Sequence, residues 1–216
     1  MGRTKKGLNG SVVGKVGPHV FYQWKGIDCV RTRPRVNKNR KLSSDETKNR
    51  GKFAYVQRFL SNLTVALRLG FHNYKENQTA FNSAMSYTLT NAVRSDEEGF
   101  YIDHSALRIS KGIPSPLNEV TLTYEDDILT CDWDYDKTIV TDLHLAGFRS
   151  LLLFMSDDEL TFNGNILDKA MDDKKEQIRI PRINDVDTIY HVHLGFVATD
   201  HSSRRIDSVY IGTITI

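Results

Sequence analysis

Three aspartates have the residue type and the spacing that could bind a metal ion. Asp132, Asp134 and Asp136 alternate with other residues, so on a strand their carboxylates would share one face. A calcium loop would need glycine at its sixth position and glutamate at its twelfth, where this sequence has Lys137 and Leu143. The aspartates are therefore interpreted as a solvated strand edge, with a weak calcium site as the alternative. No metal ion or cofactor is expected.

The histidines and the glycine-rich stretch give weaker signals. His191 and His193 also share a strand face and could ligate zinc, but the sequence identifies no third ligand, so both are interpreted as surface histidines. The stretch Gly10–Lys15 is one residue too short for a phosphate-binding loop, and Val16 stands where serine or threonine would hold magnesium. HExxH and GxSxG motifs are absent, and Cys29 has no identifiable histidine partner. The sequence predicts no catalytic residue and a non-enzymatic protein.

The charge of the chain is divided unevenly along its length. Residues 1–80 contain 17 Lys and Arg against 4 Asp and Glu, whereas residues 81–216 contain 12 against 23. A basic N-terminal part could meet nucleic acid or an acidic protein surface. The opposite charges could also attract each other head to tail between copies of the chain.

The basic charge is concentrated in the segment between Arg31 and Lys41, which carries six cations and no hydrophobic periodicity. Pro34 ends any strand that enters it. The segment is either a solvated connection or a clamp on an acidic surface or on phosphates, and it contains no aromatic residue that could stack on bases. The candidate partner-binding residues are two aromatic side chains and five cations: Tyr22, Trp24, Arg31, Arg33, Arg35, Lys38 and Arg40.

The elements that position these residues begin with three short strands. Ser11–Val16, His19–Trp24 and Cys29–Arg33 are separated by glycine-containing turns, which predicts a β-meander. Tyr22 and Trp24 are two residues apart, so they are expected on one face of the sheet.

Two helices are predicted next, as an antiparallel pair. The first begins at a capping box of Ser43 and Glu46 and ends at Gly70, and the second spans Thr79–Val93. The first helix has an apolar stripe with helical spacing: Phe53, Val56, Leu60, Leu63 and Leu67. Two helices bury too little surface to be stable alone, so they must pack on the N-terminal strands, on the C-terminal part or on other copies.

After Gly99 the period of the apolar residues changes from helical to strand-like. The predicted strands are Ile102–Ser110, Glu119–Tyr124, Ile128–Asp134, Arg149–Met155, Lys175–Pro181, Thr188–Ala198 and Val209–Ile216. The expected division is a basic module at 1–99, a strand and linker at 100–117, and an all-β sandwich at 118–216. The predicted fold class is α+β: an N-terminal β-meander plus an antiparallel helix pair, followed by the sandwich.

The C-terminal strands resemble a fibronectin type III-like or Ig-like domain. Val120–Tyr124 and Ile128–Asp134 are similar to the first two strands of that fold, and Tyr190–Val197 and Ser208–Gly212 are similar to its last two. The resemblance implies that Trp133 packs into the core from the second strand.

The whole chain also resembles an uncharacterised bacterial family, a domain of unknown function. The matching pieces are Gly14–Gly17, Val20–Gly26, Val30–Pro34, Asn49–Phe53, Leu69–Phe71, Thr79–Ala84 and Ser110–Gly112. Its strand–Arg–Pro–helix module looks like modules of phage and prophage proteins. The family carries no assigned activity or site.

These observations favour a structural or assembly protein, with a phage-like particle or virion component as its most concrete form. Its expected partners are other copies of itself or a scaffold protein. The alternatives are a nucleic-acid-associated protein that binds through Arg31–Lys52, and an adhesion or carbohydrate-binding module. The basic N-terminus is followed by no apolar segment, and the longest apolar run, Leu151–Met155, is too short to span a bilayer. We therefore expect cytoplasmic synthesis without a signal peptide, no membrane partner, and residence in a virion or particle once assembled.

Overall fold

The computed structural model divides the chain into two compact units, Met1–Ser43 and Ser44–Ile216. The residues that it describes are 3–4, 12–34, 41–71, 78–97, 99–159, 161–181, 187–200 and 202–216. The boundary between the two units lies just before the first helix, whereas the sequence analysis placed the end of the N-terminal module at Gly99. The helices therefore belong to the same compact unit as the C-terminal strands.

The first unit is an antiparallel meander of four strands, in the order β1 (Arg3–Thr4), β2 (Val12–Val16), β3 (His19–Trp24) and β4 (Ile27–Thr32). The last three agree with the predicted strands to within two residues. Lys25 and Gly26, between β3 and β4, both have positive φ values, 50° and 80°. Positive φ at both central residues is typical of the two-residue type I′ turn, whose twist matches that of antiparallel strands.

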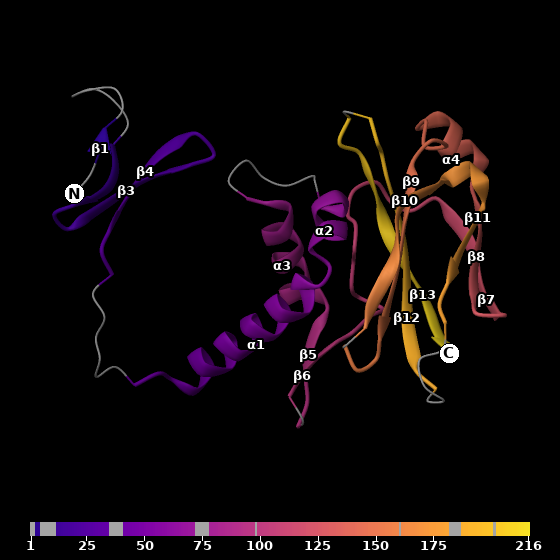
Figure 1. Cartoon of the computed structure of the whole chain (residues 1–216), viewed down its shortest axis with the longest axis horizontal. Helices are drawn as coiled ribbons and strands as arrows, with labels where there is room; N and C mark the ends of the chain where they lie inside the picture. Colours follow the sequence, from indigo (N-terminus) through magenta and orange to yellow (C-terminus); the bar gives the residue numbers. More distant parts are fainter. Residues whose placement is uncertain are drawn as a thin grey trace. The chain divides into compact units, whose positions relative to one another are not determined.

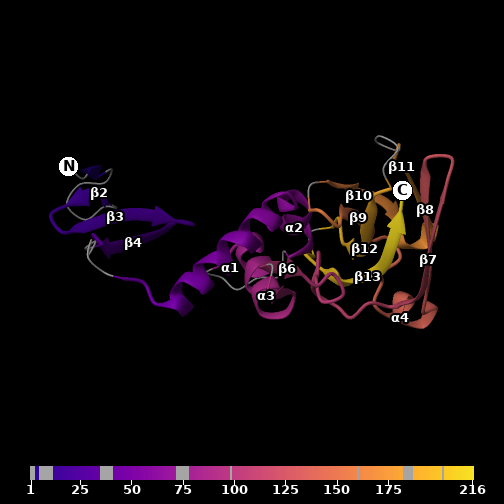
Figure 2. The ribbon, with the colours of Figure 1, turned by 90° about the horizontal axis from the view of Figure 1, so that it is seen from below.

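The second unit has three layers (Figure 1). The first layer contains α1 (Ser44–Ser61), α2 (Thr64–Gly70), α3 (Ala80–Asn91) and the hairpin of β5 (Val93–Ser95) and β6 (Phe100–Ile102). The central layer is an antiparallel sheet in the order β10 (Phe162–Ala170), β9 (Arg149–Ser156), β12 (Ile189–Val197) and β13 (Arg205–Thr215). The outer layer is a sheet in the order β11 (Lys175–Arg179), β8 (Ile128–Tyr135) and β7 (Leu117–Glu125). Two short helical segments, α4 (Lys137–Asp142) and η2 (Met171–Asp173), complete the unit. Figure 2 shows the same two sheets from below. The predicted α+β class is confirmed.

The two middle strands of the central sheet, β9 and β12, are buried on both faces, which explains the longest apolar run of the sequence. Along β9, Leu151, Leu153 and Met155 belong to the core that the sheet shares with the helices. Leu152 and Phe154 belong to the core between the two sheets. Because successive side chains of a strand point to opposite faces, a strand covered on both sides must be apolar throughout.

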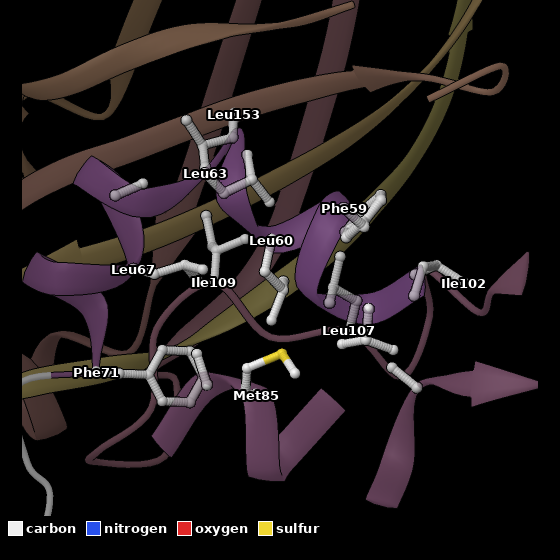
Figure 3. Close-up of a cluster of buried hydrophobic side chains, with 14 of the residues drawn as sticks. Phe59, Leu60, Leu63, Leu67, Phe71, Met85, Ile102, Leu107, Ile109 and Leu153 are labelled. Atoms are coloured by element: carbon white, nitrogen blue, oxygen red, sulfur yellow. The ribbon is translucent and has the colours of Figure 1, made fainter. Parts of the chain in front are cut away.

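The helical layer is held by the first of these cores, shown in Figure 3. Phe59, Leu60 and Leu67 are almost completely buried. Leu60 and Leu67 lie near Ile109, and Leu63 lies beside Leu153 (Figure 3). The Phe59 ring packs edge-to-face on Phe162 of β10. The helices thus pack on the C-terminal sheet. This is one of the three packing partners that the sequence analysis considered for helices too small to be stable alone.

The expected first helix is in fact two helices, because the chain breaks between α1 and α2. The Ser61 hydroxyl donates to the Arg58 carbonyl at 2.7 Å, and the Thr64 hydroxyl donates to the Ser61 carbonyl at 2.7 Å. Hydroxyl side chains that bond nearby carbonyls compete with helix continuation. Four of the predicted stripe residues are buried, but Phe53 is 51% exposed, so the stripe was assigned one turn too far toward the N-terminus.

The predicted strand Ile102–Ser110 is wrong beyond Ile102. Residues 103–110 form no strand and instead cross the helix-side face of the central sheet. The backbone N–H of Ile109 donates to the Ser208 hydroxyl at 2.8 Å, and the Ser110 hydroxyl donates to the Ile206 carbonyl at 2.7 Å. A Cβ at Gly195 would lie 2.4 Å from the Ser110 hydroxyl oxygen, so only glycine lets the segment lie this close to the sheet.

Strand β10 was missed by the sequence prediction for a structural reason. Its pairing with β9 shifts register between Ile166 and Ala170, and Leu167 has a φ of 61°. A bulge and a left-handed residue interrupt the period-2 alternation that identifies a strand.

In the part of the chain that the structure describes, no helix has both the length and the apolar character needed to cross a membrane.

We expect Gly70→Ala to destabilise the second unit by about 1–3 kcal/mol, the usual cost of overpacking. A Cβ at this position would lie 2.0 Å from the carbonyl oxygen of Ile109, which is backbone and cannot rotate away. Urea unfolding followed by circular dichroism measures the change. Gly147→Ala is the matched control, because a Cβ there meets nothing within 4 Å. Equal stability of the two variants would contradict the close packing of α2 on residues 103–110.

Candidate functional site

The meander brings three of the candidate partner-binding residues onto one face. Tyr22 pairs with Cys29, and Val20 pairs with Arg31. Since directly paired residues share a face, as do alternate residues of one strand, Tyr22, Trp24 and Arg31 lie together. We call this the Tyr22 face; its residues are Val13, Lys15, Val20, Tyr22, Trp24, Ile27, Cys29 and Arg31.

Cations lie over the two aromatic rings of the meander. The guanidinium carbon of Arg31 is 5.8 Å from the centroid of the Tyr22 ring, and the Lys25 ammonium is 5.2 Å from that of Trp24. Rings in this arrangement attract the cations electrostatically while their apolar surface remains available. The Tyr22 face is therefore both apolar and basic.

The other predicted cations are distributed differently. Arg33 follows β4, and its backbone N–H donates to the Pro18 carbonyl at 2.9 Å. Arg35, Lys38 and Arg40 lie outside the described residues, so the structure does not place them relative to the Tyr22 face.

None of the described residues of the meander, 12–34, is buried. Val13 and Ile27 are each 49% exposed on the Tyr22 face, and Val30 is 58% exposed on the opposite one. A small sheet gains stability by packing one face against another element. The meander has apolar side chains for such packing but lacks a core of its own.

A second candidate site lies in the layered unit, where three histidines meet. His191 and His193 come from β12, and His104 comes from the segment after β6. The rings of His104 and His191 stack with centroids 3.7 Å apart at 3°, and His104 Nδ1 lies 3.3 Å from His193 Nε2. His193 is completely buried, so its interpretation as a surface residue is wrong, whereas His191 is partly exposed and lines a surface pocket. The reason is that both faces of β12 are covered.

A hydrogen-bonded chain runs from this cluster to the surface. His191 Nε2 is 3.1 Å from a carboxylate oxygen of Asp157, and His191 Nδ1 is 2.9 Å from the Tyr210 hydroxyl. These contacts assign a tautomer in which Nε2–H donates to Asp157 and Nδ1 accepts from Tyr210. The arrangement resembles an oriented base beside a hydroxyl. Burial, together with nearby carboxylates, raises the pKa of Tyr210, so the hydroxyl keeps its proton and is not an activated nucleophile.

The electrostatics of the cluster keep two of its imidazoles neutral. Burial, assisted by His191, lowers the pKa of His104 from 6.5 to about 4, although nearby carboxylates oppose the shift. Burial and the neighbouring histidines lower the pKa of His193 well below 6.5. His193 Nδ1 is buried and has no hydrogen-bond partner among the residues that the structure describes. A proton on either ring is therefore unfavourable while the cluster is closed.

A surface pocket of about 360 Å³ opens beside the cluster. Its lining is polar and aromatic: Tyr101, Ile102, Asp103, His104, Ser105, Asp157, Glu159, His191 and Tyr210. Among the described residues, no three or more His, Cys, Asp or Glu side chains are arranged to hold a metal ion. The stacked rings of His104 and His191 place their faces, not their nitrogen lone pairs, toward each other.

The three alternating aspartates have separate structural roles. Asp134 lies 2.7 Å from the Lys174 ammonium, and Asp132 lies 3.9 Å from that of Lys175. Asp136 is the N-cap of α4, where its carboxylate accepts from the N–H groups of two helix residues at 2.8 Å and 3.2 Å. Asp132 and Asp134 lie on β8, the middle strand of the outer sheet, so the prediction of a strand edge is wrong, although both side chains are solvent-exposed.

One further buried titratable group lies between the two sheets. Glu176 on β11 is completely buried, and neither carboxylate oxygen has a hydrogen-bond partner among the described residues. Burial raises its pKa, although the side chains of Ser150 and Asn165 oppose the shift. A lone glutamate in a polar-looking strand, KEQIR, gave no sequence signal of this position.

Comparison with known proteins identifies a family. The model of a family of unknown function (DUF6266) matches residues 9–212. A search of curated proteins finds no match. The family match spans both compact units, so the meander and the layered unit occur together in the family pattern.

We expect Glu176→Met to stabilise the protein by about 1–3 kcal/mol at pH 8, the usual cost of a buried polar group without a partner. The folded state holds its carboxyl proton more tightly than the unfolded state, so the wild type loses stability as pH rises above about 4.5. The advantage of the variant should shrink toward pH 4. Chemical unfolding at several pH values measures this, with the exposed Glu119→Met as the control for loss of charge. A pH-independent difference between Glu176→Met and the wild type would show that Glu176 is not ionised by unfolding.

Proposed function

We propose that this chain, which belongs to the family of unknown function DUF6266, is a non-enzymatic assembly protein that docks through the Tyr22 face of its N-terminal meander. The observation that supports this most is the complete lack of buried residues among residues 12–34, although apolar side chains occupy both faces of the sheet. A partner surface supplies the core that the meander lacks.

Composition of the Tyr22 face supports a protein partner. Tyrosine, tryptophan and arginine are the residues that most often dominate the energy of protein interfaces. Tyr22 is 41% exposed and holds Arg31 over its ring, so both side chains are preorganised before contact. Preorganised side chains lose less conformational entropy on binding.

The division of charge supports another copy of the chain as the partner. Residues 1–80 contain 17 cations and only 4 carboxylates, whereas residues 81–216 have an excess of carboxylates. Surfaces of opposite sign on one chain steer copies toward head-to-tail contact. A separate acidic scaffold protein would satisfy the same chemistry.

The polar clusters support a non-enzymatic role. The aspartates of β8 pair with lysines or cap a helix, and Tyr210 is held protonated. His193 is buried beneath the pocket, and the Ser105 hydroxyl in the pocket lining donates to Asp103 rather than to a histidine. Each cluster therefore has a structural explanation.

Two finer proposals concern the architecture. The order β11-β8-β7 against β10-β9-β12-β13 supports a fibronectin type III-like sandwich, because that fold also pairs a three-stranded with a four-stranded sheet. Trp133 is buried on β8, packs edge-to-face on Phe196, and donates to the Met171 carbonyl at 2.8 Å. A role in a phage-like particle or virion depends on sequence resemblance alone.

A second candidate function is nucleic-acid binding through Arg31–Lys52, and the meander geometry adds one observation in its favour. The basic segment has no aromatic residue of its own, but Tyr22 and Trp24 share a face with Arg31. Aromatic rings beside cations form the stacking surfaces on which single strands bind.

We expect the purified protein to form a defined oligomer, free of nucleic acid, and Tyr22→Ser/Trp24→Ser to convert it to a monomer. Removing the two rings deletes the apolar part of the Tyr22 face without changing the charge. Light scattering at low and high salt, after nuclease treatment, measures the mass.

Gln23→Ser is the matched control, because Gln23 lies on the opposite face of the same strand and should leave the oligomer intact. A wild-type protein that stays monomeric up to its solubility limit contradicts assembly. Co-purified nucleic acid that is released by salt, and lost on Arg31→Glu, would instead support the second candidate.

A further inference from the structure

We propose that His104, His191 and His193 form an acid-sensitive latch between the helical layer and the central sheet of the layered unit. The latch is closed while all three imidazoles are neutral and opens when the cluster takes up protons. This inference is independent of the proposed assembly function, because it concerns only residues of the second compact unit.

The cluster joins the two layers directly. His104 belongs to the segment that follows β6, and its ring lies edge-on to Phe59 of α1, with centroids 6.2 Å apart at 69°. On its other side it stacks on His191 and bonds to His193, both on β12 of the central sheet. Nearby, the Tyr55 hydroxyl of α1 donates to Glu159, which follows β9. The same region therefore ties α1 and residues 103–110 to the sheet.

The geometry of the closed cluster tolerates few protons. The contact between His104 Nδ1 and His193 Nε2, at 3.3 Å, needs one nitrogen to accept, so protonating both rings breaks it. A proton on His193 Nδ1 would be a buried donor without a partner. Charges on both His104 and His191 would repel across a stack of 3.7 Å.

The groups that face the cluster act in opposite directions. Carboxylates of Asp103 and Asp157 favour protonation of His104, and Glu159 lines the same pocket. Arg108, whose guanidinium donates to the Ser208 carbonyl, disfavours protonation of His193.

His191 is the surface end of the cluster, and its two nitrogens face oxygen atoms. His191 contacts Asp157 at 3.1 Å and the Tyr210 oxygen at 2.9 Å, so both of its N–H groups would have acceptors. A positive charge on one ring of the stack opposes protonation of the other, so further proton uptake by the cluster requires separation of the layers.

The sign of the pH dependence follows from the difference between the closed and open states. In the open state the histidines return to an ordinary pKa of 6.5, whereas closure holds the pKa of His104 near 4. The open state thus binds more protons, and the closed state weakens as pH falls from 6.5 to about 4. For His104 alone this gap changes the closed-to-open ratio by about 300-fold.

The test compares the full-length protein between pH 7.5 and pH 4. We expect amide hydrogen exchange in α1 and residues 103–110 to rise together with binding of an apolar dye, because opening exposes the core around Phe59 and Leu107. The pH dependence of the exchange rate should correspond to the uptake of two or more protons on opening. Far-ultraviolet circular dichroism should lose at most the helical signal over the same range, because the two sheets keep the core between them.

His104→Gln is the diagnostic variant, because its amide oxygen can still accept from the His193 Nε2–H but does not titrate. We expect it to open at lower pH than the wild type and with about one proton fewer. His19→Gln, an exposed histidine of the meander, is the matched control and should behave as the wild type. Opening of His104→Gln at the wild-type pH and with the wild-type proton uptake would assign the transition to carboxylates and overturn the latch.

A second measurement uses the wild type alone. Imidazole proton resonances should show His104 and His193 neutral until the layers open. If both titrate near pH 6.5 while hydrogen exchange in α1 stays slow, protonation does not open the layers and the proposal fails.

Discussion

The central sheet of the second unit is covered on both faces, and most of the structure follows from that constraint. Each face of β9 and β12 presents apolar side chains that must be removed from water, at a gain of about 25 cal/mol for each Å² buried. The outer sheet covers one face and the helical layer covers the other. Neither cover would be stable alone, since short helices and three-stranded sheets depend on packing. The two covers therefore depend on the central sheet for their stability, although the three layers come from separate parts of the chain.

Covering both faces also traps polar groups that a one-sided sheet would leave in water. The segment 103–110 satisfies several of them, because Ser110 and the N–H of Ile109 bond to β13. His193 is satisfied only through one nitrogen, by His104. The histidine cluster thus occurs where an irregular segment, rather than a regular helix, completes the cover of the sheet.

The meander presents the opposite situation within the same chain. It alternates apolar and polar residues as a sheet does when it packs, yet none of residues 12–34 is buried. Its turns are well formed, with positive φ at Lys25 and Gly26, so its lack of a core does not reflect a lack of local order. This combination of formed turns and exposed apolar faces is the observation that supports the proposal that the meander docks on a partner.

Periodicity predicted those elements whose environment is uniform along their length. The strands β7, β8, β9, β12 and β13 were located because apolar spacing and turn residues agree. Periodicity failed where the environment changes along the chain. At Ser61, side-chain hydroxyl bonds break the helix, and at Leu167 a bulge interrupts β10. After Ile102, apolar residues cover the central sheet without forming a strand of it.

The two candidate sites also differ in how far the sequence could predict them. The two-residue spacing of Tyr22 and Trp24 was sufficient to place them on one face, but the position of Arg31 needed the register of β3 and β4. His104 lies 89 residues from His193, and no local pattern links them. Long-range contacts of this kind depend on tertiary packing, which a single sequence does not reveal.

The buried titratable groups set limits on stability from both sides of the pH scale. The histidine cluster is neutral in the folded state, so folding is disfavoured as pH falls below 6.5. Glu176 has a raised pKa, so folding is disfavoured as pH rises above about 4.5. The two effects lie in different cores, the histidines on the helix side of the central sheet and Glu176 between the sheets. An acid change therefore weakens the attachment of the helical layer while it relieves the core between the sheets. The two sheets should stay folded at a lower pH than the helical layer, because protonation removes the buried charge of Glu176 from the core between them.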